Sequence, residues 1–479
     1  MGSINNKLIL ELELNDNNFK FFSSIEEAQN VANKELSKIN KLILDNEEII
    51  KKLTPECDKV DYILATCSGA ICEIIDIFLV AKPGQAQFQN ITDKWFENRT
   101  KDFAKLCGWN NDNSTIESAI RYLEKKFKIP YDQTGMGLSG ALYIDLTPKN
   151  HHFKSLGHNP SLLGLFFSIL NQFNNTSSFI SNGELITHSP NNNFELQGND
   201  IPSKIFCGFI NWFGHIISDM SGSSSSSGRG MGIPSPLWSW TNDIIAIKSS
   251  LKIPVSDFDK NINELALEIY KEGYDARFQA TQAIPVFINE LIVRFFYSIR
   301  RLIQYFKNNT FNNFSFSELW KNCEPFSNAT VKRMLTVAHG TFCLIDVSDA
   351  IAQGIIYGGG YFNVSEFIMR LNIPGIGRFS ISLYGEFDRK FKKIANENED
   401  KYLKMKEVVV KDYIDALNEL AEIYDDITLR NLVEDFKSSD IYIKAFEKSV
   451  LLAEKRNVDK DKILRNKANI DNYFTGGNS

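Results

Sequence analysis

The sequence lacks the motifs on which several large enzyme classes depend. It has no GxxxxGKS or GxxxxGKT loop to bind nucleotide phosphates and no GxSxG turn to present a nucleophilic serine. Its seven cysteines are scattered without a CxxC pair, and their odd number fits free thiols in a reducing compartment. We therefore expect a protein that is not an enzyme and that has no cofactor.

Positive charge is also in short supply. The chain of 479 residues has 53 Lys and Arg against 59 Asp and Glu, which gives a formal net charge of −6. A dedicated nucleic-acid-binding protein usually has a basic face and a high pI. We therefore expect no nucleic-acid partner.

No segment has the composition of a simple transmembrane span, which needs about 20 mainly apolar residues. The longest apolar stretches are too short or contain acids, each of which costs roughly 2.5–3.5 kcal/mol at the centre of an inserted helix. They are residues 62–81 with Glu73 and Asp76, residues 205–218, and residues 335–365 with Asp346 and Asp349. The N-terminus also has no signal-peptide pattern. We expect a cytoplasmic protein and keep peripheral membrane contact as an alternative.

A glycine, a short apolar run and then a carboxylate recur in three stretches. They are residues 69–76 (GAICEIID), 214–219 (GHIISD) and 340–346 (GTFCLID). Small residues allow helices to approach closely, and a buried carboxylate is costly unless it is paired. These glycine-and-acid stretches predict either tightly packed core helices or helices that meet a membrane or a partner.

The acids of these stretches and their neighbours have two interpretations. They are Glu73, Asp76, Asp219, Asp346 and Asp349. In the first interpretation, the helices cross from core to solvent and the acids lie on the wet face. In the second, the acids are buried and pair with basic residues, which fixes the surfaces that meet. The candidate basic partners are Arg294, Arg300, Arg301 and Arg378.

A cluster of histidines near an aspartate is the candidate metal site. Imidazole and carboxylate together are the usual ligands of a hydrolytic metal ion. The residues are Asp145, His151, His152 and His158. Because their spacing matches no helix-borne ligand pair at i and i+4, we expect a structural or exposed cluster, with a metal-dependent hydrolase as the alternative. His188 is a further ligand only if its hairpin folds back, and His339 is expected to be a core histidine.

The residue patterns predict a mainly α-helical protein with small β-hairpins. Residues 183–198 (GELITHSPNNNFELQG) predict a hairpin around a Ser-Pro-Asn turn, and residues 370–387 predict a turn followed by a strand. We divide the chain into four parts. They are a hairpin and amphipathic helix at 1–60, a helical and hairpin core with a Ser/Gly loop at 61–256, the other half of the core at 257–385, and a charged helical arm with a disordered tail at 386–479.

Four aromatic residues lie near the Ser/Gly-rich tract at residues 221–236. They are Trp212, Phe213, Trp238 and Trp240. Aromatic rings gather at membrane boundaries and in the energetic centres of protein interfaces. We expect these four at an interface, with the tract as a mobile loop.

Several long phrases resemble a widespread group of bacterial proteins of similar length. They are DKWFENRTKDFAKLCGW, FKSLGHNPSLLGLFFSILNQF, KIFCGFINWFGHIISDMSG and RLNIPGIGRF, and the likeness covers most of residues 60–380. It implies a bacterial origin and a shared fold, but no activity or catalytic residue. The glycine-and-acid stretches also resemble the glycine-zipper helices of membrane-active bacterial proteins.

Together these features favour an assembly or effector protein that oligomerises or engages a membrane through its glycine-bearing apolar helices. In a bacterium its role would be antiviral defence or toxicity. The metal-dependent hydrolase is one alternative, and a scaffold that binds a partner protein through the C-terminal arm is another. The expected partner is a second copy of the chain or another protein.

Overall fold

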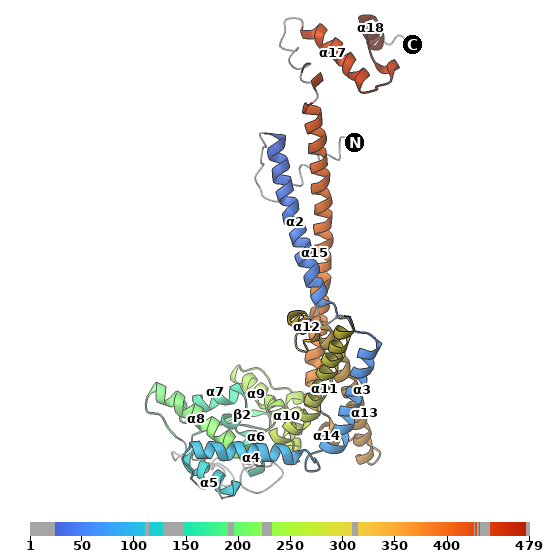
Figure 1. Ribbon diagram of the computed structural model, residues 1–479. Helices are drawn as coiled ribbons and strands as arrows, with labels where there is room; N and C mark the ends of the chain where they lie inside the picture. Colours follow the sequence, from blue (N-terminus) through green and yellow to red (C-terminus); the bar gives the residue numbers. More distant parts are fainter. Residues whose placement is uncertain are drawn as a thin grey trace. The chain divides into compact units, whose positions relative to one another are not determined.

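The computed structural model describes residues 24–110, 115–127, 148–189, 196–222, 232–308, 315–425, 427–428, 431 and 441–475. Within these ranges the chain is mainly α-helical with one two-stranded antiparallel sheet, which confirms the predicted fold class (Figure 1). The hairpin expected within residues 1–60 and the Ser/Gly residues 223–231 lie outside these ranges. The chain forms two units, residues 1–54 with 389–479, and residues 55–388.

The first unit is built on an antiparallel pair of helices. Helix α2 (Ile25–Leu53) begins at Ser24, whose side chain accepts a hydrogen bond from the Glu27 amide, as the SIEE sequence predicts. It packs on the part of α15 (Ile373–Asp425) that follows residue 388, and the buried contacts include Ile39, Ile43, Leu403 and Val410.

Polar contacts fix the direction of this pair. Gln29 bonds to Asn418, whereas Asn46, further along α2, bonds to the carbonyl of Asn396, so the two helices run in opposite directions. The unit also contains α17 (Ile441–Lys455), η4 (Lys460–Lys462) and α18 (Lys467–Thr475).

Four helices of the second unit form a bundle. They are α3 (Lys59–Ile75) with its continuation η1 (Asp76–Val80), α11 (Ala276–Asn308), α13 (Ala329–Tyr357) and residues 373–388 of α15. Figure 1 shows α3, α11 and α13 together, and the short helices α12 (Phe316–Cys323) and α14 (Val364–Arg370) adjoin them. We call this set of four helices the four-helix bundle.

Glycines allow the close approach that the glycine-and-acid stretches predicted. A Cβ atom at Gly69 of α3 would lie 2.2 Å from the Ala338 carbonyl oxygen of α13. At Gly340 of α13, a Cβ atom would lie 3.0 Å from the Phe379 ring of α15. A larger side chain at Gly69 would require the neighbouring helix to move, whereas at Gly340 a small shift of the Phe379 ring would be needed.

The other helices of the second unit surround smaller apolar cores. They are α4 (Gln89–Leu106), α5 (Ile116–Lys126), α6 (Pro148–Lys154), η2 (Leu156–His158), α7 (Leu162–Asn174), α8 (Ile201–Asp219), α9 (Pro236–Ser250) and α10 (Asp257–Lys271). One core lies between α4, α5 and α8 and includes Trp109, Leu123 and Phe127. Another includes Leu156, Phe167 and Ile245. These cores position η2 and α8, which carry side chains discussed below.

Strand β2 has a partner strand that was not predicted. Strand β2 (Glu184–His188) pairs with the preceding strand β1 (Ser177–Ser181), whereas residues 190–195, which include much of the predicted partner strand, lie outside the described ranges. Asn182 and Gly183, which link the strands, have φ values of 52° and 75°. Asn-Gly is a favoured two-residue hairpin turn because both positions require positive φ.

The turn and strand predicted at residues 370–387 are wrong, because α15 begins at Ile373 and continues through this segment. Asn372 caps the helix by accepting a hydrogen bond from the Gly375 amide at 2.8 Å. Pro374 is compatible with a first helical turn, where its missing N–H is not needed. Contacts of Ile376 and Phe379 with the bundle core then stabilise a helix whose local sequence favours a strand.

Candidate functional site

The four-helix bundle exposes a large apolar surface. The segments Lys59–Val80, Ala276–Lys307 and Ala329–Tyr357 are long and apolar enough, by length and composition, to cross a membrane. The exposed apolar side chains include Ile63, Ile74 and Phe78 on α3 and η1, Phe287, Leu291, Phe295 and Ile303 on α11, Leu344, Ile355 and Ile356 on α13, and Ile381 and Phe387 on α15. No simple transmembrane span was predicted from the sequence, because composition alone does not show that the acids face the interior of the bundle.

The interior of the same bundle holds many polar side chains. Ser68 of α3 donates a hydrogen bond to the Asn289 side chain of α11 at 2.6 Å, and both residues are buried. His339 of α13 is buried as expected for a core histidine, and its Nε2 lies 3.8 Å from Glu290 Oε1 of α11. The bundle thus has an apolar exterior and a partly polar interior.

Glu290 is the centre of an ion-pair network in the middle of the bundle. It accepts a hydrogen bond from Arg378 of α15 and another, at 3.0 Å, from Arg294. Arg294 and Arg378 therefore pair with an acid that the sequence analysis did not single out.

One end of the bundle carries a second ion-pair network. Arg300 of α11 donates hydrogen bonds to both Asp58 and Asp61, and Arg301 lies 3.0 Å from Asp61. The Arg300 guanidinium holds the pKa of the Asp58 carboxyl well below its usual range. Arg300 and Arg301 also pair with acids other than the five that were singled out.

At the other end of the bundle lies the acid cluster, which we define as Glu73, Asp76, Asp346 and Asp349. One carboxylate oxygen from each of the first three lies within 4.8 Å of the others. Glu73, Asp76 and Asp346 are no more than 1% exposed, whereas Asp349 is half-buried. Among the described residues, neither carboxylate oxygen of Glu73 has a hydrogen-bond partner.

Two residues next to the start of α15 contact the acid cluster. Arg370 donates a hydrogen bond to Asp349 at 2.5 Å and lies 4.0 Å from Asp76. Asn372 donates through its side chain to Asp76 at 2.6 Å and through its backbone N–H to Asp346 at 3.0 Å. Four acids thus face one arginine, and such an excess of buried negative charge is costly unless protons or a cation neutralise it.

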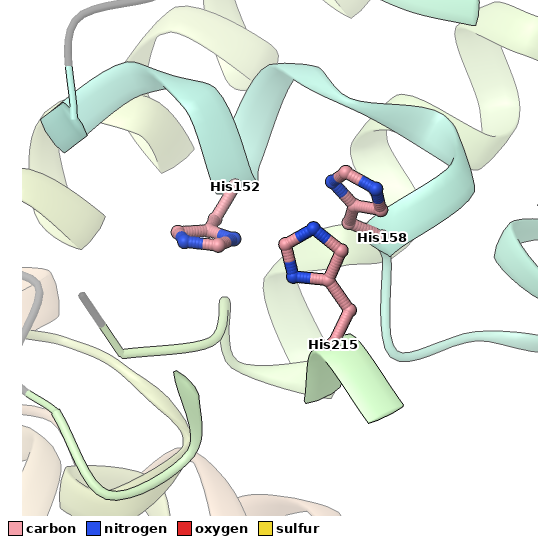
Figure 2. Close-up of side chains that lie close together, drawn as sticks. All are labelled: His152, His158 and His215. Atoms are coloured by element: carbon pink, nitrogen blue, oxygen red, sulfur yellow. The ribbon is translucent and has the colours of Figure 1, made fainter. Parts of the chain in front are cut away.

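A histidine cluster lies among the helices outside the bundle. His152 of α6, His158 of η2 and His215 of α8 each offer one ring nitrogen, and these atoms lie within 4.8 Å of one another. Figure 2 shows the three rings turned toward one another. Asp219, one turn after His215 on α8, lies 2.9 Å from His215 Nδ1 and 3.5 Å from His152 Nε2. We call these four residues the histidine cluster.

The histidine cluster differs in part from the candidate metal site of the sequence analysis. His152 and His158 belong to it, but Asp145 and the side chain of His151 lie outside the described residues. His215 and Asp219 complete it, and Asp219 had been singled out only as an acid. The i, i+4 spacing of His215 and Asp219 is the sequence signal that could have indicated a helix-borne ligand pair.

The four aromatic residues of the sequence analysis have different surroundings. Trp212 donates a hydrogen bond to the Asn159 carbonyl at 2.7 Å, and Phe213 packs edge-on against Phe103. Trp238 packs edge-on against Tyr274, whereas Trp240 is exposed. The structure does not bring these four rings into the apolar surface of the four-helix bundle.

Comparison of the chain with protein-family models, with curated proteins and with solved structures found no match. The bundle and the two buried clusters are therefore the features from which a function can be inferred.

Proposed function

We propose that the protein is a non-enzymatic assembly or effector protein that is embedded in a membrane through the four-helix bundle. The observation that supports this proposal is the apolar exterior of the bundle combined with its partly polar interior. Each square ångström of apolar surface left in water costs about 25 cal/mol, a cost that lipid would remove. In a bilayer, ionisable side chains pair with one another, and the half-buried side chains of Glu290 and Arg378 form such a pair here.

The length of the bundle fits this proposal. The segment Lys59–Val80 has 22 residues, which at 1.5 Å per residue gives about 33 Å, close to the hydrocarbon thickness of about 30 Å. Charged groups lie at both ends, with Asp58 and Arg300 at one and Lys82 at the other. Lys82 lies 3.2 Å from Glu366 and 4.6 Å from the ring centre of Tyr357, and lysine with tyrosine is typical of a membrane–water boundary.

Contact between copies of the chain in water is the main competing explanation of the apolar surface. A self-assembled protein would bury the same side chains against a second copy and would need no lipid. The two other functions expected from the sequence, a metal-dependent hydrolase and a scaffold that binds a partner protein, remain untested predictions. A hydrolytic site needs an open metal position for substrate, whereas the histidine cluster is deeply buried.

The first experiment is fractionation of cells that express the full chain. The protein is expected in the membrane pellet after an alkaline carbonate wash and in solution only after detergent is added. Protein that stays in the soluble fraction without detergent would contradict the proposal. If that soluble protein is an oligomer by light scattering, contact between copies explains the apolar surface instead.

A pair of matched variants tests which surface is responsible. Phe287, Leu291 and Phe295 are exposed and four residues apart on α11, so they share one helix face. Changing all three to Asp is expected to move most of the protein out of the washed membranes, because each buried charge costs roughly 2.5–3.5 kcal/mol.

The control changes three exposed apolar residues outside the bundle to Asp. They are Leu106, Leu251 and Phe258. This variant is expected to fractionate like the unmodified protein. Equal loss of membrane binding in both triple variants would mean that the bundle is not the membrane-embedded part.

A further inference from the structure

We propose that the histidine cluster binds one divalent transition-metal ion of the zinc class. The inference goes beyond the proposed membrane role and does not depend on it, because His152, His158, His215 and Asp219 lie outside the four-helix bundle. The ion would join α6 and η2 to α8, which follows them in the sequence only after α7 and the β1–β2 hairpin.

The ligand types favour such an ion. Neutral imidazole nitrogens suit zinc and its neighbours in the first transition row, whereas magnesium and calcium prefer sites made of oxygen atoms. Three neutral imidazoles would bind a divalent cation, and the Asp219 carboxylate that contacts two of them adds one negative charge beside it.

The distances are close to those of a tetrahedral site. Metal–ligand distances of about 2.1 Å place neighbouring ligand atoms about 3.4 Å apart. In the histidine cluster, one nitrogen from each of the three rings lies within 4.8 Å of the others. Side-chain movements of about 1 Å would bring these nitrogens to coordination distance.

Local packing holds the ligands in place. His215 and Asp219 are one turn apart on α8, so a rigid helix presents both. The Trp212 indole bonds to the carbonyl of Asn159, the residue that follows His158, and so ties η2 to α8. On the third element, the Asn242 side chain donates a hydrogen bond to the Phe153 carbonyl, next to His152. Ligands held by such contacts lose little further conformational entropy when an ion binds.

Asp219 would orient a neighbouring ligand and would not itself bind the ion. Its Oδ2 lies 2.9 Å from His215 Nδ1, so Nε2 would be the His215 nitrogen that meets the ion, and Figure 2 shows a His215 ring nitrogen directed between His152 and His158. A hydrogen-bond network without metal would explain the contacts of Asp219 with two rings. A shared ion would in addition explain why one nitrogen from each of the three rings lies within 4.8 Å of the others.

The burial of the histidine cluster indicates a structural ion. His152, His158, His215 and Asp219 are 2%, 5%, 4% and 2% exposed, respectively. Structural zinc sites have four protein ligands and no open position, whereas catalytic sites keep one position for water or substrate. Here three imidazoles supply the ligands, and their burial leaves the fourth position of the ion without access for a substrate, which favours a structural role.

Metal analysis of the full-length protein tests the inference. The protein is purified without chelator, through a tag that does not bind metal, and its ions are counted by mass spectrometry. We expect about one zinc, or one other first-row transition ion, per chain. His158→Ala and Asp219→Asn are expected to reduce this to below about one tenth, whereas His188→Ala, on the hairpin, is expected to retain the ion.

A second measurement uses the unmodified protein, so that it gives a result even if the variants fail to fold. The unmodified protein is stripped with a chelator and titrated with Co²⁺, which gives intense visible absorption bands in a four-coordinate site. One equivalent of Co²⁺ is expected to produce these bands, and Zn²⁺ is expected to remove them. Metal-free protein as isolated, together with no cobalt absorption, would overturn the inference and leave a hydrogen-bonded cluster without an ion.

Discussion

The acid cluster and the histidine cluster each bring together four ionisable side chains, most of them buried, but they differ in charge. Glu73, Asp76, Asp346 and Asp349 have the same sign, and Arg370 contributes one opposing charge. The histidine cluster combines three groups that can be neutral with a single carboxylate. Burial alone therefore does not define a ligand site. The histidine cluster would gain stability from the proposed ion. The acid cluster destabilises the fold, and the contacts around it must offset that cost.

The largest expected effect is the removal of metal from the histidine cluster. Chelation is expected to lower the free energy of unfolding by roughly 5 kcal/mol or more, because the ion binds the folded chain far more tightly than the unfolded chain. Thermal unfolding with and without chelator measures it. His158→Ala protein should be insensitive to the same chelator, and a chelator effect of equal size in that variant would place the ion elsewhere.

Loss of Arg370 is the corresponding change at the acid cluster. Arg370→Met is expected to destabilise the fold by about 3 kcal/mol, because it leaves Asp76 and Asp349 buried without their cation. Denaturant unfolding in detergent measures the change. The control is Arg99→Met, which removes an exposed pair with Asp102 and should change stability by less than about 0.5 kcal/mol. Equal effects from both variants would mean that the acid cluster does not depend on Arg370.

Gly69 tests the packing that brings the acid-bearing helices together. Gly69→Ala is expected to cost about 2 kcal/mol, because the new Cβ atom would force α3 away from the Ala338 carbonyl. In Gly377→Ala, by contrast, no atom lies within 4 Å of the new Cβ atom, and a gain of about 0.5 kcal/mol is expected. The difference in melting temperature between the two variants is the readout. No difference would indicate that α3 and α13 do not pack closely.

Substitution of Glu73 tests whether the acid cluster, unlike the histidine cluster, is stable without a bound cation. Glu73→Met removes a buried carboxylate that has no hydrogen-bond partner among the described residues, so a gain of about 1 kcal/mol is expected. Asp219→Leu, the matching change in the histidine cluster, is expected to destabilise. A large loss of stability in Glu73→Met would instead mean that the acid cluster also depends on a bound cation.

The smallest effect is expected at an ion pair that belongs to neither cluster. Lys248 lies 2.5 Å from Asp259 and, together with hydrogen bonds from Ser256, lowers the pKa of that carboxyl from 3.8 to about 2. A lowered pKa means that the pair stabilises the fold above about pH 4 and that its contribution is lost as the pH falls toward 2. NMR titration of Asp259 in the unmodified protein and in Lys248→Met checks this, and an unchanged pKa in the variant would contradict it.

Local patterns were sufficient to predict the fold class. The SIEE capping sequence marked the start of α2, and glycine beside apolar runs marked positions where helices pack closely, as at Gly69 and Gly340. The β1–β2 pairing was missed because the Asn-Gly turn at 182–183 was not weighed against the longer Ser-Pro-Asn sequence. The start of α15 was missed because tertiary contacts outweigh local strand preference.

The candidate sites were harder to predict because their members come from distant parts of the chain. Two of the four metal-ligand candidates, His152 and His158, are close in sequence and were found, but nothing local links them to His215 on another helix. Basic residues were matched to the wrong acids for the same reason, since Arg370 reaches Asp76 only when α14 folds against η1. Amphipathic patterns predict which residues are buried, not which buried residues meet.

Asn372 links all four helices at the end of the bundle that carries the acid cluster. Its backbone and side chain bond at once to Asp346 of α13, Asp76 of η1, the Gln282 carbonyl of α11 and the first turn of α15. Asn372 therefore links four helical segments, and local unfolding of one segment at this point would break contacts of the other three. Hydrogen exchange at this end should consequently open all four segments together, at a single rate.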